Sequence, residues 1–167
     1  MHTIDVLSSG LMRTDLNLLD PKVISPLFAE QPELYEWKRM SPFDLTQELC
    51  TTSWELLTWL LLSDVEVPNR KWLLLTACYP TAWHVERCSH ELLKTLVGTN
   101  DIVIRRLINA AHVWAAGGWH YPMTIPGMKL YMMDDWEIFV KGVVPNQVVN
   151  PALTSWVDWF NAGGMGR

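Results

Sequence analysis

The segment from Asn100 to Gly118 is the part of the sequence that most constrains what the chain can fold into. It reads NDIVIRRLINAAHVWAAGG, and after the first turn its polar side chains are Arg105, Arg106, Asn109 and His112. Thr99 or Asn100 can cap a helix here, and the two glycines can end it. An apolar surface this wide has to be covered by neighbouring elements on most sides. The pattern therefore predicts a helix over 101–116 that is the most buried in the chain and lies at the centre of the fold.

Other segments with helical spacing predict the rest of a bundle. The letters SPFD at 41–44 are typical of a capped helix start, and the leucines behind them predict an interior helix over 42–63. A helix over 81–97 should end at Gly98. The Asn-Pro pair at 150 and 151 predicts a final helix over 150–162.

The remaining segments are predicted to be less regular. Residues 1–20 read as an N-terminal arm, and 119–149 reads as a partly extended loop that wraps the bundle, because it holds a Pro-Gly turn and further prolines. Within this loop, DDWEIFVKG suits a strand and a short helix equally. The predicted fold is therefore mainly α: a single domain over 1–167, an irregular bundle of about five to seven helices, with 41–118 as its helical core.

Charge is distributed unevenly along this acidic chain, whose net charge is −5. Residues 1–68 carry a net charge of −7, whereas residues 69–129 carry +4. The two parts either pair within the fold or leave an acidic N-terminal third that faces a basic partner. The basic side chains are few and not clustered with aromatic ones, so direct binding of nucleic acid is not expected.

The cysteines and the N-terminus predict a compartment. The chain has three cysteines, no CxxC pair and no basic, apolar leader resembling a signal peptide. Reduced thiols in the cytoplasm are the corresponding expectation. No apolar run approaches the ~20 residues that a membrane span needs, so we expect no association with a membrane.

His84, Cys88 and Glu91 would share one flank of the predicted helix over 81–97. A thiolate beside an imidazole is a possible nucleophile, and the same pair can ligate a metal. No second Cys/His pair at ligand spacing exists in the sequence, so no metal or other cofactor is predicted. The simpler interpretation places Cys88 at the edge of the core and His84 at its rim.

A second polar group is predicted on the helix over 101–116. Arg105, Asn109 and His112 form its polar band, and a histidine on a largely buried helix is usually a hydrogen-bonded core residue. The alternative is a small polar pocket that His84 or His120 completes.

Aromatic side chains supply the predicted interaction surface in this chain of ten tryptophans. Trp83 lies opposite the buried stripe predicted by Val85, Leu92 and Leu96, so it must meet another element or a partner. The loop that follows the helix-ending glycines carries more aromatic residues, and loops of this kind commonly bind. The predicted interaction residues are Trp83, Arg87, Trp119, His120, Tyr121 and Met123. Alternatively, the loop folds back as a lid on its own core.

No catalytic fingerprint is present: there is no phosphate loop, GxGxxG, GxSxG, HExxH or calcium loop. Asp134 and Asp135 could act as an acid/base pair or hold magnesium, although adjacent carboxylates on a turn are usually solvated. No catalytic residue is therefore assigned.

The first hypothesis for function is a non-enzymatic protein-binding module. It would be an inhibitor or adaptor of the phage anti-defence or immunity-protein type, acting on a larger complex, of which a basic, nucleic-acid-handling complex is one candidate. A second hypothesis is a small enzyme without a recognisable motif that uses His84, Cys88 or His112. A third is a structural subunit that self-associates through the aromatic loop. The sequence leaves the oligomeric state open.

Overall fold

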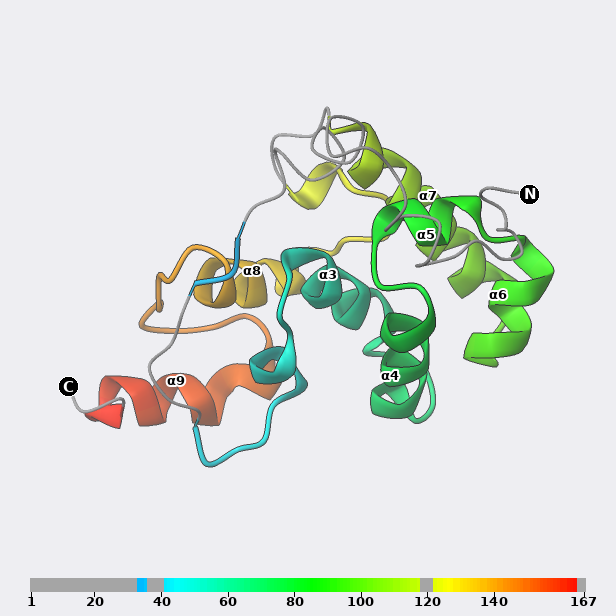
Figure 1. Cartoon of the computed structure of the whole chain (residues 1–167). Coiled ribbons are helices and arrows are strands. Elements are labelled where there is room, and N and C mark those ends of the chain that lie inside the picture. Colours follow the sequence, from blue (N-terminus) through cyan, green and yellow to red (C-terminus); the bar gives the residue numbers. More distant parts are fainter. Residues whose placement is uncertain (1–32, 36–40, 118–121, 165–167) are drawn as a thin grey trace.

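The computed structural model describes residues 33–35, 41–117 and 122–164. Within these ranges the chain forms α-helices and short 3-10 turns and no strand, which confirms the predicted mainly α bundle of five to seven helices. The helices are α3 (Ser53–Leu62), α4 (Pro68–Cys78), α5 (Ala82–Arg87), α6 (His90–Val97), α7 (Asp101–Ala116), α8 (Met133–Phe139) and α9 (Thr154–Asn161). Figure 1 shows α3 between a group formed by α5, α6 and α7 and a second group formed by α8 and α9.

The bounds predicted for α7 are confirmed. The Asn100 side chain accepts a hydrogen bond from the backbone N–H of Val103 at 3.0 Å, and Gly117 ends the helix in the left-handed region at φ 73°. The inner face packs against α3, α5 and α6, and Leu107 there is fully buried. The outer face is open to solvent, and Ile102 on it is 67% exposed. The helix is thus central but not covered on all sides, and α3, with eight buried residues of ten, is the more enclosed.

The predicted helix over 42–63 begins eleven residues late, at Ser53. Asp44 has a φ of 52°, which a right-handed helix does not allow, and the chain forms only the 3-10 turn η1 (Thr46–Leu49) before α3. Ser41 is not a helix cap, since its hydroxyl donates to Glu48 at 2.8 Å. The actual cap is Thr52, whose side chain accepts from the N–H of Glu55 at 3.1 Å.

The predicted single helix over 81–97 is two helices, which is a correction. α5 stops at Arg87, Cys88 is extended, and Ser89 caps α6 by accepting from the N–H of Leu92 at 3.1 Å. The break turns α6 relative to α5, so the predicted stripe does not continue: Leu92 is 46% exposed. The break has a local cause, because a serine side chain that caps a new helix competes with continuation of the old one.

The predicted loop over 119–149 is partly helical in its described residues, 122–149. It forms the 3-10 turns η2 (Pro122–Thr124) and η3 (Leu130–Met132), and the DDWEIFVKG segment becomes α8 rather than a strand. The predicted C-terminal helix is present as the turn η4 (Pro151–Leu153) followed by α9. The predicted arm over 1–20 lies outside the described residues.

Tryptophans join the two groups of helices. Trp114 of α7 lies with its ring centroid 5.6 Å from that of Trp54 in α3 and 6.0 Å from that of Trp136 in α8. Near the C-terminus, Trp156 of α9 packs on Phe139 of α8 at 5.5 Å. No helix in the described ranges combines the length and apolar character needed to cross a bilayer.

Candidate functional site

His84 and Cys88 do not form a reactive pair with Glu91 on one helix face, because the helix that would carry all three is broken. His84 is 2% exposed on α5, and its Nδ1 lies 2.6 Å from the Thr81 hydroxyl. Cys88 is buried where α5 ends, and burial raises the pKa of its thiol, although a hydrogen bond with Tyr79 opposes the change. A thiol whose pKa is raised supplies little thiolate at neutral pH. Glu91 is exposed on α6.

The polar band predicted on α7 faces solvent. Arg105 and Asn109 are exposed, and the His112 side chain is 74% exposed. The Nδ1 atom of His112 lies 2.7 Å from a carboxylate oxygen of Glu86, which ties α7 to α5 at the surface. His112 is therefore not the buried core residue that was predicted, and it does not share a pocket with buried His84.

The predicted interaction residues are divided by the fold. Trp83 is 7% exposed, with the guanidinium of Arg87 lying 4.3 Å from its ring centroid. Trp83 thus meets its own chain, and the exposed Arg87 covers it. Met123 in η2 is half-buried against the core. The other three predicted residues, Trp119, His120 and Tyr121, lie outside the described ranges, and their role stays a prediction.

The pair Asp134 and Asp135 is a structural clamp, which corrects the expectation of two solvated carboxylates. Asp135 is fully buried and accepts hydrogen bonds from Gln47 Nε2 at 2.7 Å and Asn150 Nδ2 at 3.0 Å. Asp134 accepts from the backbone N–H groups of Val149 and Asn150. The pair holds η1, α8 and the segment before η4 together. Burial raises the pKa of Asp135 from 3.8 to about 6.

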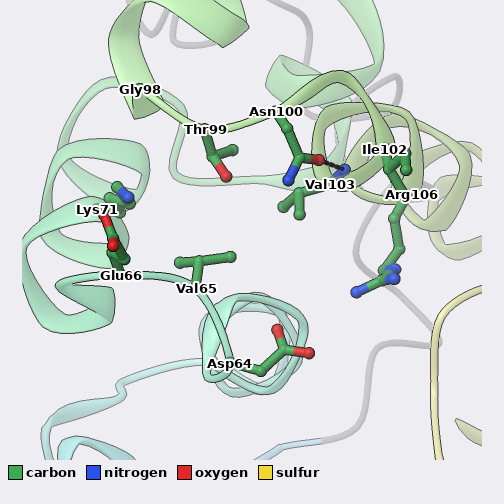
Figure 2. Close-up of a pocket in the computed structure, with 10 residues that line it drawn as sticks. All are labelled: Asp64, Val65, Glu66, Lys71, Gly98, Thr99, Asn100, Ile102, Val103 and Arg106. Atoms are coloured by element: carbon green, nitrogen blue, oxygen red, sulfur yellow. Dashed lines mark hydrogen bonds between the residues drawn. The ribbon is translucent and has the colours of Figure 1, made fainter.

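A pocket of about 590 Å³ lies between the start of α4 and the turn that joins α6 to α7 (Figure 2). Sequence patterns gave no sign of it, because its wall comes from three separate segments. The lining residues are Asp64, Val65, Glu66, Lys71, Gly98, Thr99, Asn100, Ile102, Val103 and Arg106. Figure 2 shows Lys71 and Arg106 on opposite sides of the space, with Thr99 directed into it.

The loop that forms one wall of this pocket ends in a strained residue. Val67 adopts φ 48° and ψ 57°, a left-handed conformation that is unfavourable for a β-branched side chain, and it is 63% exposed. Strain of this kind is retained only where the surroundings hold the backbone, and it gathers at binding sites. Val67 directly follows Glu66, which lines the pocket.

One face of α4 has apolar side chains, and no other helix among the described residues covers it. Only Trp72 and Leu75 of this helix are buried, and the Trp72 indole N–H donates to the carbonyl of Glu55 at 2.9 Å. The exposed residues repeat at intervals of three and four, so they share one side of the helix. They include Arg70, Leu73, Leu74 and Cys78, which we call the α4 face. Leu73 is 56% exposed and Leu74 is 37% exposed.

Among the described residues, no group of three or more His, Cys, Asp or Glu side chains lies close enough together to hold a metal ion. No protein-family model matches the chain, and no curated protein matches it.

Proposed function

We propose that the protein is a non-enzymatic protein-binding module that acts as an inhibitor or adaptor and engages its partner through the α4 face. The observation that supports this is the exposure of two neighbouring leucines, Leu73 and Leu74, on a helix otherwise held firmly by Trp72 and Leu75. Exposed single leucines are common, whereas an apolar row along one side of a helix resembles an interface.

The partner that suits this surface is an amphipathic helix with acidic residues near one end. The α4 face spans nine residues, about two and a half turns, which is a length that one partner helix can cover. Arg70 and Lys71 stand in the first turn of α4, and no acidic side chain accompanies them there. The helix dipole adds positive charge at the same end. Carboxylates on the partner would be attracted to this end and would set its orientation.

Changing Leu73 to Glu is expected to weaken binding of the partner at least tenfold. The substitution places a charge in the centre of the apolar contact, and tenfold corresponds to only about 1.4 kcal/mol of binding free energy. Leu73 is exposed, so the fold should be retained, which circular dichroism checks. The partner is captured from extracts of the source organism on the immobilised wild-type chain, and affinity is then measured by titration of the purified complex.

The matched control is Val149→Glu, which adds the same charge at a side chain that is 65% exposed on the segment before η4. A photo-crosslinking residue at position 73 or at position 149 gives an independent measurement. We expect crosslinks from position 73 alone, to an acidic segment of one protein. Equal capture by both variants, or crosslinks to a second copy of this chain, would contradict the proposal, and the latter would favour a self-associating subunit instead.

The other hypotheses have less support. A small enzyme that uses His84, Cys88 and His112 together would need them in one place, and the first two are buried while the third is exposed on another helix. The acidic N-terminal third that would face a basic complex lies mostly outside the described residues. Of its described carboxylates, Glu48 and Glu55 are engaged in internal hydrogen bonds. A basic partner at that surface stays a prediction.

A further inference from the structure

We propose that the pocket between α4 and the α6–α7 turn binds a small ligand through an oxyanion, either a carboxylate or a phosphate. This site shares Lys71 with the positive end of α4, but it does not rest on the proposed function.

The stem of Arg106 is closely packed, and the residue lines the pocket. It is half-buried, and a Cβ added to Gly127 would lie 2.4 Å from Arg106 Cγ and 2.9 Å from a methyl group of Leu61. The absence of a side chain at Gly127 therefore makes room for the stem of the arginine. An arginine whose stem is restrained in this way loses less rotamer freedom when its guanidinium binds an anion.

Lys71 approaches the same space from the opposite wall. Within the described part of the chain, neither Lys71 nor Arg106 lies within ion-pairing distance of a carboxylate. Figure 2 shows the Thr99 hydroxyl directed into the space between them. The start of α7, the positive end of that helix dipole, opens on the same side. Lys71, Arg106, Thr99 and the start of α7 therefore give the pocket hydrogen-bond donors and positive charge.

The acidic side chains of the pocket are compensated or lie in water. Asp64 and Glu66 are exposed, and Lys129 lies 3.8 Å from a carboxylate oxygen of Asp64. Asp101, at the start of α7, is held by Lys94 at 2.8 Å and by His90 at 3.1 Å. An anion between Lys71 and Arg106 is thus opposed mainly by Glu66, which is solvated.

The dimensions of the pocket limit the ligand to a small molecule. A volume of about 590 Å³ lies within the usual range for ligand pockets, about 300–1,000 Å³. Val65, Ile102 and Val103 supply apolar wall beside the cations. The chemistry that fits is one oxyanion attached to a compact body with some apolar surface. Exposed Glu66 at the edge of the pocket disfavours a second negative charge there.

A nuclear magnetic resonance titration of the full chain tests the proposal. Sodium phosphate and sodium butyrate, a monocarboxylate with a short apolar body, are added in separate experiments, with sodium chloride holding ionic strength constant. We expect saturable shifts of the backbone amides of Thr99 and Ile102 with at least one of these probes. Saturation by phosphate alone identifies a phosphate-bearing ligand, and saturation by butyrate alone identifies a carboxylate.

Two neighbouring arginines provide the matched pair of variants. Arg106→Gln is expected to weaken the apparent affinity at least tenfold, whereas Arg105→Gln, exposed on the outer side of α7, should change it less than twofold. Lys71→Gln should also weaken binding. If the Arg106→Gln variant does not fold, Lys71→Gln tests the site in its place. Shifts that do not saturate with either probe, or an equal loss in both arginine variants, would overturn the site. Leu73→Glu should leave the titration unchanged.

Discussion

Replacing Trp114 by alanine is expected to lower the free energy of unfolding by about 4 kcal/mol, because large-to-small changes of buried tryptophan cost about 3–5 kcal/mol. Trp114 is 1% exposed, and its ring contacts Trp54 in α3 and Trp136 in α8. Its removal would leave a cavity at the point where three helices meet, and it would also remove two aromatic contacts worth about 0.5–1.5 kcal/mol each. Urea unfolding followed by circular dichroism measures the change.

The control for Trp114 is Ile102→Ala, on the exposed face of the same helix. Ile102 is 67% exposed, so its truncation should change the free energy of unfolding by less than about 0.5 kcal/mol. A third variant, Trp114→Phe, keeps a ring in the site and should lose less than the alanine variant. A loss below about 1 kcal/mol for Trp114→Ala would show that α3, α7 and α8 do not meet as described.

The wild-type chain is expected to lose part of its stability relative to Asp135→Asn as pH rises from 4 to 7. Burial raises the pKa of Asp135 from 3.8 to about 6, so the folded chain holds a proton that the unfolded chain has released. The resulting stability is fully present below pH 3.8 and is lost as pH rises through 6. The shift corresponds to about 3 kcal/mol across that interval, and the asparagine variant lacks it.

The measurement is the difference between the free energies of unfolding of wild type and Asp135→Asn at several pH values, because the difference cancels the other titrating groups. At pH 4.5 the variant should be the less stable chain, by about 1–2 kcal/mol, since its amide group cannot accept from both Gln47 and Asn150. The difference should fall by about 2 kcal/mol between pH 4.5 and 7, so that it vanishes or reverses sign. A difference that stays constant with pH would contradict a buried, titrating carboxyl. Asp158→Asn, on the exposed side of α9, serves as a control with a change below about 0.5 kcal/mol.

The parts of the fold that were predicted correctly depend on signals within a single helix. For α7, the cap at Asn100, the left-handed glycine at its end and the apolar inner face all act over a few residues, so the sequence contains them directly. The start of α9 after an Asn-Pro pair is of the same kind. The mainly α class follows from several such segments together.

The errors concern places where local signals compete. The segment 81–97 has helical spacing throughout, yet the Ser89 side chain caps a second helix, and tertiary packing decides between the two outcomes. The 42–63 segment has a good cap sequence, but Ser41 and Glu48 hydrogen-bond to each other across η1 instead. Neither competition can be decided from spacing alone.

The candidate sites were missed for a different reason, which is that they are non-local. Asp135 is a buried clamp only because Gln47, 88 residues away in sequence, supplies a donor. The pocket unites Lys71 with Arg106 and depends on Gly127 to admit the arginine stem. The α4 face could not be predicted because an apolar run such as WLLL at 72–75 indicates burial of all its residues. The sequence does not show which side of the helix stays exposed.

The distribution of the three thiols provides a ready-made reporter of docking. Cys78 is exposed and belongs to the α4 face, whereas Cys50 and Cys88 are buried, and burial raises the pKa of both of their thiols. A maleimide reagent at neutral pH should therefore modify the native chain once, at Cys78. Mass spectrometry of the tryptic peptides would show the label there, and a bound partner should slow the modification. Labelling at Cys88 at an equal rate would contradict its burial. A fluorophore attached at Cys78 would then follow association without any engineered cysteine.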